Sequence, residues 1–375
     1  MSILSPAGVN AEDYRTINDF RLAPTDRLQA AELIANVIIP DLPEAVCEID
    51  LHCHSFYSDG YNSPSMLVLE AFRRGMKGIA ISDHDVIDGQ REAIAAGKIF
   101  GIDIVPAVEF YTDRPGIEII AHFPDQQHFL SLLDVRAFDP VCEPIRAAKK
   151  KQLTGMLARI PACMNTYGFK AEITKSDIDT YLRNGISTKG DISVAMWQKY
   201  GPELAARGIA SDVKDFQAKY TTKDDQLNLP LELDMDLSPE AFVTRIRKLG
   251  GLAGIAHPTE LRRKEHLGNE SLYRIICDLA ELGLQTFEVD GWRNEICPES
   301  GLHQTELFEQ LRQRWNSEHP KLPPLLFTNG GDSHNQPGEG LELGCGKDRN
   351  MRSKFGRHEN IQQLRERQQI LFSNQ

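Results

Sequence analysis

The feature that most constrains the fold of this 375-residue chain is a series of seven short apolar runs that alternate with helical segments. Several of these runs are almost continuously apolar, which is typical of strands buried on both faces of a sheet. Alternation of strands and helices predicts an α/β fold with a mostly parallel sheet or barrel. The runs cover residues 46–52, 78–83, 103–109, 118–122, 252–257, 284–290 and 325–332.

The segments between the runs carry signals for the ends of helices. Ser63 and Ser238 each precede a proline, a pattern in which serine caps the helix and proline occupies its first turn. Gly101 and Gly283 follow helical segments, where glycine readily adopts the left-handed conformation that ends a helix. These signals predict helices that begin and end in the connections between strands.

Residues 125–230 interrupt the alternation, because they are helical and polar in pattern and contain no comparable apolar run. We therefore expect an inserted helical subdomain here. The α/β body would comprise residues 46–124 and 231–375, and residues 1–45 would form an N-terminal extension to which the sequence assigns no function.

The composition excludes several classes of protein. Apolar residues make up 41% and charged residues 26%, which is ordinary for a soluble globular chain. The net charge of −12 disfavours stable binding to duplex nucleic acid, because such binders attract phosphate backbones with positive charge. The chain has no apolar run of about 18 residues that could span a membrane. It also has no secretory signal, and its seven cysteines are scattered, so we expect a cytoplasmic protein.

Each apolar run has a histidine or an acid at or just past its end, and six of the eleven histidines lie there. The carboxyl ends of parallel strands face a common crevice, so these side chains are expected to converge. His52 and His54 are two residues apart, as are Asp332 and His334, and on a strand each pair points to one side. Imidazole and carboxylate together favour Zn, Mn or Fe, which predicts a functional metal cluster.

The residues around these histidines resemble a known family. The motifs are DLHCHSFYSDG (50–60), GIAISDHD (78–85), VEF (108–110), IIAHF (119–123), GIAHP (254–258) and GGDSH (330–334). In this order they resemble the PHP (polymerase and histidinol phosphatase) superfamily over roughly residues 46–345. The resemblance implies a distorted (β/α)7 TIM-like barrel that holds two or three divalent ions (Mn, Zn or Fe) at its C-terminal face.

The resemblance also implies which residues bind each ion. His52 and His54 would hold the first ion together with Asp332. Glu109 would bridge that ion to a second one, which His122 would also bind. The third ion would be held by Asp59, His84 and His334.

The chain departs from the family pattern inside the insert, where phosphoesterase members usually carry Gly-Arg-Pro-His. The matching segment here is residues 188–192. Asp191 could replace the histidine as a metal ligand, and Lys189 could replace the arginine as a phosphate contact. Alternatively, Asp191 caps the following helix, and the site is then dinuclear or altered in specificity.

Three further residues are candidates for a role beside the metals. Asp83 could orient a histidine ligand, or it could cap its own turn. His257 could contact the phosphate or protonate the leaving oxygen, or it could make a structural hydrogen bond. Arg293 follows the sixth run and is the best placed cation for a phosphate, although solvated surface charge is the more common role for a single residue such as Arg293 or Lys189.

The resemblance implies a metal-dependent phosphoesterase, in which a metal-activated hydroxide hydrolyses a small phosphorylated substrate. A nucleotide 3′,5′-bisphosphate or a short oligonucleotide is the best match, because relatives with those substrates have an insert at this place. A histidinol-phosphatase-like activity and a non-catalytic metal-binding module are the alternatives. The sequence does not indicate an oligomeric state.

Overall fold

A computed structural model describes residues 8–40, 47–179, 189–222, 227–290, 296–335, 343 and 356–372. The chain divides into two compact units. The first comprises Met1–Phe56, Gly60–Ala137 and Asp236–Gln375, and the second comprises Tyr57–Asp59 and Phe138–Met235. The sequence predicts an insert with boundaries at residues 125 and 230. These boundaries differ from those of the second unit and stay a prediction.

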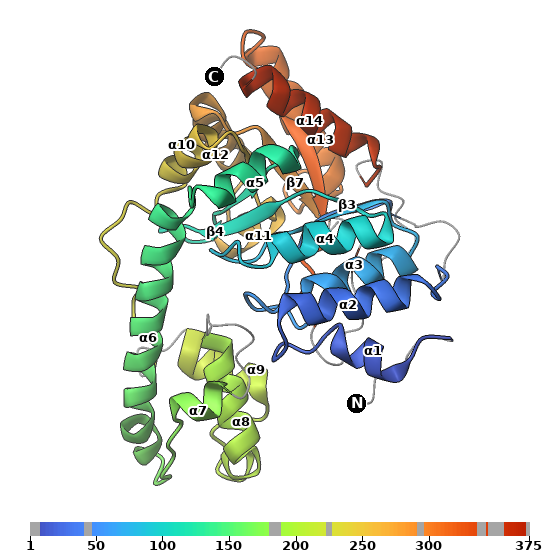
Figure 1. The fold of residues 1–375 in the computed structure, drawn as a ribbon. Helices are drawn as coiled ribbons and strands as arrows, with labels where there is room; N and C mark the ends of the chain where they lie inside the picture. Colours follow the sequence, from blue (N-terminus) through green and yellow to red (C-terminus); the bar gives the residue numbers. More distant parts are fainter. Residues whose placement is uncertain are drawn as a thin grey trace. The chain divides into compact units, whose positions relative to one another are not determined.

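The first unit is a mixed α/β structure built on two sheets (Figure 1). One sheet has the order β1-β2-β3 and is parallel, and the other has the order β4-β5-β6-β7-β8. The strands are β1 (Ile49–Cys53), β2 (Gly78–Ile81), β3 (Asp103–Ile104), β4 (Ala107–Tyr111), β5 (Glu118–His122), β6 (Leu252–Ile255), β7 (Thr286–Asp290) and β8 (Leu326–Gly330).

Strand β5 runs against its neighbours, which the expectation of a mostly parallel sheet does not foresee. It pairs antiparallel with both β4 and β6, whereas β6, β7 and β8 pair in parallel. Only residues 112–117 separate β4 from β5, and a parallel neighbour needs a crossover of about a dozen residues or more. The third apolar run is also divided, because Pro106 has no N–H to donate to a neighbouring strand.

The paired strands of the described residues do not form a closed barrel. Two isolated parallel bridges connect the two sheets, one between Cys53 and Ser333 and the other between His84 and Glu109. Both bridges lie at or just beyond the carboxyl ends of β1, β2 and β8. The two sheets therefore meet where the sequence places its histidines and acids.

The helix signals of the sequence are confirmed at both kinds of helix end. The Ser63 side chain accepts a hydrogen bond from the Met66 N–H, and Ser238 caps its helix in the same way. Gly101 and Gly283 end their helices with φ angles of 70° and 113°. The helices of this unit are α1 (Ala11–Thr16), α2 (Pro24–Ala35), α3 (Pro64–Arg73), α4 (Gln90–Phe100), α5 (Gln126–Asp134), α10 (Pro239–Lys248), α11 (Pro258–Lys264), α12 (Asn269–Leu282), α13 (Gln304–Glu318) and α14 (Glu359–Phe372).

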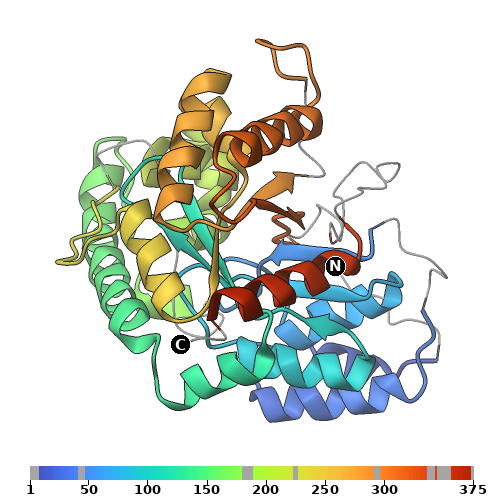
Figure 2. The same ribbon diagram turned by 90° about the horizontal axis from the view of Figure 1, so that it is seen from above.

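Helix α14 covers the end of the strands opposite to the bridges, and Figure 2 shows it in red, lying across them. Its Ile361 and Leu364 are buried in an apolar cluster with residues of the two sheets. The approach is close at Gly78, where an added Cβ would lie 2.6 Å from the Ile361 side chain. The sheet partners in this cluster are Ile49, Leu51, Ala80, Ala107 and Leu252.

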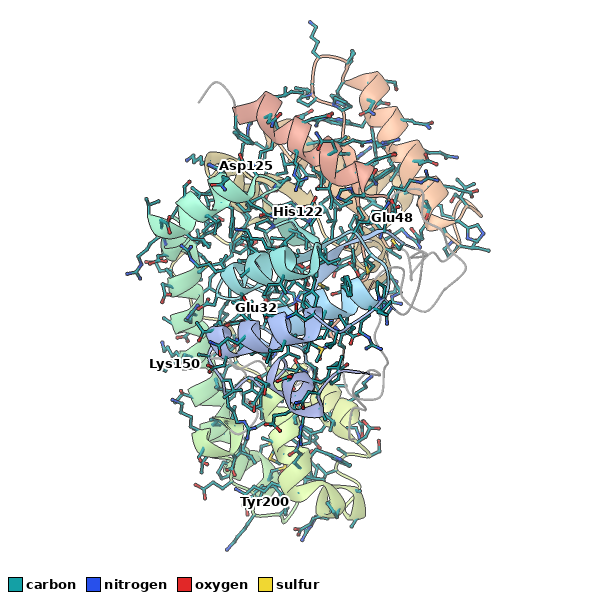
Figure 3. The ribbon with its side chains drawn as sticks, turned by 45° about the vertical axis from the view of Figure 1, so that its right-hand side comes forward. Glu32, Glu48, His122, Asp125, Lys150 and Tyr200 are labelled. Carbon is teal, nitrogen blue, oxygen red and sulfur yellow. The ribbon has the colours of Figure 1, made fainter. Side chains whose placement is uncertain are left out.

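The described part of the second unit is helical and has its own apolar core. Large side chains such as Ile160, Met196 and Phe216 are fully buried in it. Figure 3 labels Lys150 on the longest helix and Tyr200 on another. The elements are α6 (Asp139–Asn165), α7 (Lys175–Asp179), α8 (Lys189–Ala206), α9 (Val213–Phe216) and the π-helix η1 (Gln217–Thr222).

Among the helices that the structure describes, none combines the length and the apolar character that crossing a bilayer requires.

Candidate metal centre

Four side chains from three strand ends face one another in the first unit: His52, His54, Glu109 and Asp332. The Nε2 atoms of His52 and His54 are 3.1 Å apart, and Glu109 Oε2 lies 3.0 and 3.3 Å from them. Asp332 Oδ1 lies 3.6 Å from the first of these nitrogens and 3.2 Å from the second.

These distances allow a test of whether the four side chains fit a metal ion. Nitrogen and oxygen ligands bound about 2.0–2.1 Å from one ion in a tetrahedron lie about 3.3–3.4 Å from one another. The contacts given above fall on both sides of that value, and all four donor atoms converge on one point. The donor set of imidazoles and carboxylates also matches Zn, Mn or Fe. The group therefore fits a divalent ion.

Glu109 turns its two carboxylate oxygens toward different histidines. Oε2 faces His52 and His54, and it also lies 3.2 Å from His84 Nδ1. Oε1 lies 3.0 Å from His257 Nε2. The Glu109 side chain is fully buried, so it is held in this orientation between His52, His54 and His84 on one side and His257 on the other.

Strand β5 brings Glu118 to this place, a residue that the sequence motifs do not indicate as a ligand. Glu118 pairs with Tyr111 at the end of β4, and its Oε2 lies 3.3 Å from His257 Nε2. It also belongs to a group with His84 and Glu109 whose donor atoms could share an ion. The signal was present in the sequence, because a connection as short as 112–117 indicates a hairpin, in which the start of β5 lies beside the end of β4.

His122, which the resemblance implies as a ligand, lies at the other end of the same hairpin. It pairs with Ala107 at the start of β4, and its Nε2 donates a hydrogen bond of 2.9 Å to the Leu51 carbonyl. Figure 3 labels His122 in the interior of the unit, where it is fully buried. Burial lowers its pKa to about 4, so the ring is neutral at physiological pH. His122 belongs to none of the groups of candidate metal ligands among the described residues, and its role as a ligand stays a prediction.

Glu288 at the end of β7 holds His52 from behind. Its two oxygens lie 3.0 and 3.1 Å from His52 Nδ1, and Oε2 also accepts a hydrogen bond of 2.7 Å from the His257 backbone N–H. A carboxylate on Nδ1 keeps the proton there and leaves Nε2 free to bind a metal. The sequence placed Glu288 at a strand end, but it gave no sign of a partner 236 residues away.

A cluster of aromatic rings adjoins the group formed by His52, His54, Glu109 and Asp332. The centroid of the His54 ring is 4.5 Å from that of His84 and 4.3 Å from that of His334, and Tyr111 stacks on His84 at 4.1 Å. Asp59, the predicted fourth member, belongs to the second compact unit, so its part in this set stays a prediction.

Asp83 contacts the loop after β1 rather than a histidine ring in its described hydrogen bonds. Its Oδ1 accepts from the Ser55 N–H at 2.8 Å, and its Oδ2 accepts from the Ser55 hydroxyl at 2.6 Å. Asp83 thereby fixes the residue that follows His54. These two contacts are structural, and a role of Asp83 in orienting a histidine ligand stays a prediction.

Burial and charge act together on these side chains. Burial alone would lower the pKa of His52, but the carboxylates of Glu109 and Glu288 outweigh it and hold that pKa well above its usual value. Burial raises the pKa of Glu118, and the nearby Glu109 carboxylate raises it further. Carboxylates buried beside one another are costly unless a cation compensates them, which again favours a divalent ion here.

Backbone strain gathers at the same place. Asp85, His257 and Asp332 all have positive φ angles, of 59°, 27° and 49°. Such angles are uncommon for residues other than glycine, and they cluster at functional sites where the surrounding structure enforces them. Each of these residues follows the end of a parallel strand, where the positive φ angle changes the direction of the backbone.

The remaining predicted residues lie elsewhere in the chain. Asp191 and Lys189 lie in the first turn of α8 in the second unit. The negative charge of Asp191 there interacts favourably with the positive end of the helix dipole. Arg293 lies outside the described residues. Their roles toward metal or phosphate stay predictions.

The fold and this centre define a class of protein: an α/β protein with a candidate multi-metal centre at the carboxyl ends of its strands. Residues 50–219 match the PHP domain family. This part of the chain is thus similar to a PHP domain, as its motifs indicated.

Two curated relatives and one solved structure are similar to the chain. It is 43% identical to the 5′-3′ exoribonuclease of Haemophilus influenzae over 81 residues, which are 21% of this chain and only 30% of that relative. It is 24% identical to the 3′,5′-nucleoside bisphosphate phosphatase of Chromobacterium violaceum over 295 residues, which are 79% of this chain and 90% of that relative. A crystal structure assigned as a metal-dependent phosphoesterase from Bifidobacterium adolescentis has a TM-score of 0.58 at 21% identity, covering 86% of this chain and 96% of the other. The last match shows a shared fold.

Proposed function

We propose that this protein is a metal-dependent hydrolase of phosphate ester bonds in a small phosphorylated substrate. The observation that carries the proposal is the position of Glu109 between two sets of histidines, with Oε2 toward His52 and His54 and Oε1 toward His257. A carboxylate in that position is arranged to bridge two ions, the geometry that clamps both oxygens of a phosphoryl displacement. A phosphatase and an exoribonuclease among the relatives support the same chemistry.

In this proposal, the first ion would be held by His52, His54, Glu109 and Asp332. The second would be held by Glu109, Glu118 and His257, so that His257 would act as a ligand in place of His122. Divalent ions bound here (Mn, Zn or Fe) would lower the pKa of a coordinated water and neutralise charge on the phosphoryl oxygens. Glu288 would keep His52 in the tautomer that binds an ion.

A third ion and the contacts to the substrate belong to the same proposal. The close His54, His84 and His334 rings support a third ion, to which Asp59 would be added from the resemblance. Asp191 would be a further ligand, and Lys189 and Arg293 would contact the phosphate.

We infer that the substrate is a nucleoside 3′,5′-bisphosphate or a short oligonucleotide. The bisphosphate phosphatase of C. violaceum, which aligns with most of the chain, supports this inference. The net charge of −12 favours a small substrate over an extended duplex. A histidinol-phosphatase-like activity is the alternative substrate class, and a non-catalytic metal-binding module is the alternative function.

We also propose that the strands form the distorted (β/α)7 barrel that the resemblance implies. The two isolated bridges support it, because they would join the two sheets on both sides of β1 and β2. The short β3 would then lie outside the ring.

The test is hydrolysis with Mn²⁺, measured as phosphate release from nucleoside 3′,5′-bisphosphates and histidinol phosphate and as nucleotide release from a short oligonucleotide. Asp332→Asn serves as the control, with circular dichroism to verify that this variant folds. Release that disappears in the variant would support the hydrolase and identify its substrate class. If metal-loaded protein hydrolyses no member of the panel, the hydrolase is rejected and the binding module takes its place.

A further inference from the structure

The segment between β1 and α3 is closely held by its own backbone. We call residues 54–63 the ligand loop, because it begins at His54 and includes the predicted ligand Asp59. The Phe56 N–H donates to the Asn62 carbonyl at 2.9 Å, and the Gly60 N–H donates to the Ser55 carbonyl at 3.0 Å. No side chain fits at Gly60, since an added Cβ would lie 2.1 Å from the His54 carbonyl oxygen.

The N-terminal segment contacts the far end of the ligand loop with three hydrogen bonds. Asn18 Oδ1 accepts from the Ser63 N–H at 2.6 Å, and Asn18 Nδ2 donates to Asn62 Oδ1 at 3.0 Å. The Ser63 hydroxyl donates to the Ile17 carbonyl at 2.5 Å. Asn18 therefore fixes the loop where it enters α3, on both sides of the bond between Asn62 and Ser63.

Arg27 of α2 contacts the near end of the loop. Its guanidinium lies 4.9 Å from the centre of the Phe56 ring, two residues after His54. The guanidinium is fully buried and makes a two-pronged ion pair of 2.9 and 2.6 Å with Glu92 of α4. Glu92 in turn accepts a hydrogen bond of 2.8 Å from the Ser65 hydroxyl at the start of α3. A bidentate pair of this kind fixes the guanidinium plane over Phe56.

We propose that the N-terminal segment, residues 8–35, is a positioning element of the metal centre, with Asn18 and Arg27 as the positioning residues. They hold the two ends of the ligand loop, and so set the place of His54 before any ion binds. Ordering a loop in advance removes part of the entropic cost of binding. The proposal rests on the proposed function to the extent that the centre must bind a divalent ion.

The same segment offers a matched control. The Tyr14 hydroxyl donates a buried hydrogen bond of 3.1 Å to Glu70 in the middle of α3, and so secures the segment without contacting the ligand loop. Tyr14→Phe removes a comparable contact between the same two parts of the chain. A purely structural role for the segment would make Tyr14→Phe and Asn18→Ala equivalent.

The experiment measures binding of Co²⁺ and Mn²⁺ to the full chain, by calorimetry and by the visible absorption of bound Co²⁺, with thermal unfolding in parallel. We expect Asn18→Ala and Arg27→Lys to weaken metal binding about tenfold, the lower end of what loss of an outer partner costs a metal site. Tyr14→Phe should leave the affinity unchanged. Asn18→Asp keeps the acceptor for the Ser63 N–H but loses the donor to Asn62 Oδ1, so it should restore only part of the affinity.

Two results would overturn the proposal while leaving the proposed function intact: unchanged metal affinity in both Asn18→Ala and Arg27→Lys, or an equal loss in Tyr14→Phe. Unfolding temperatures of the variants decide whether Arg27→Lys reports on the loop or on a misfolded chain, and in the second case Asn18→Ala decides alone. Wild-type protein that binds neither metal would reject the proposed function, and this proposal with it.

Discussion

At one end of the strands of the first unit, histidines and carboxylates face one another, whereas at the other end apolar side chains pack against α14. Both kinds of environment are met within one short strand. In β1, Leu51 is buried in the apolar cluster that includes α14, whereas the next residue, His52, faces the metal centre. Polar side chains are tolerated in the interior where partners compensate them, and apolar packing at the other end keeps the strands in place. The comparison shows how one set of strands supplies both rigidity and chemistry.

Strand β5 makes the comparison sharper, because its two ends carry ionisable residues with different surroundings. Glu118 lies among the candidate ligands, and His122 lies at the packed end with the Leu51 carbonyl as its partner. The direction of the strand, more than the type of residue, decides which of the two can meet a metal.

The largest effect is expected at Glu109, which faces both sets of histidines. Glu109→Gln keeps the shape of the side chain but removes the charge and one acceptor oxygen. We expect metal affinity and phosphate release to fall by more than about a hundredfold, which is the upper range for loss of an outer partner alone. Calorimetric metal titration and the phosphate assay measure this, and near wild-type binding would contradict the bridging role.

The comparison within β5 predicts unequal effects of two matched substitutions. Glu118→Gln should weaken binding of the second ion by about ten- to a hundredfold. His122→Gln should leave metal affinity unchanged, because the amide can still donate to the Leu51 carbonyl and His122 belongs to no group of candidate ligands among the described residues. Metal content per chain and Co²⁺ titration of both variants give the answer. A loss of metal in His122→Gln with none in Glu118→Gln would reverse the assignment.

A smaller effect is expected at Glu288, which contacts His52 but no ion in the proposed centre. Glu288→Gln loses the negative charge that holds the proton on His52 Nδ1, and we expect about a tenfold loss of metal affinity. Thermal unfolding of the metal-free variant serves as the control for general damage. Affinity equal to that of wild type would indicate that packing alone orients His52.

The last effect concerns stability and should leave metal binding untouched. The folded pKa of His122 is about 4, below its ordinary value of 6.5, so the unfolded chain takes up a proton that the folded chain refuses. This residue therefore destabilises the fold progressively as the pH falls from about 6.5 to about 4, by at most about 3 kcal/mol. Denaturant unfolding of His122→Gln at several pH values should show a shallower decline than wild type. Parallel declines would contradict the assignment.

Local signals made part of this structure predictable. Spacing identified the pair His52 and His54, and capping residues such as Ser63 marked helix ends, because these depend on neighbours within a few residues. Glu288 could not be assigned a role, since its partner is fixed only when the carboxyl ends of β1 and β7, which lie in different sheets, come together. The burial of His122 depends on the direction of β5. A sequence motif shows which residue is present but does not show the direction in which its strand runs in the sheet.

The position of Glu109 between two sets of ligands also links the occupancies of two ion positions. An ion bound to one oxygen of Glu109 would fix the carboxylate in the orientation that the second ion needs. By reciprocity, the second ion would then strengthen the binding of the first. Loading would be cooperative wherever this gain exceeds the repulsion between the two cations. A chain of this kind would respond to the supply of metal over a narrow range of concentration, as a threshold sensor does, and half-loaded molecules would be scarce.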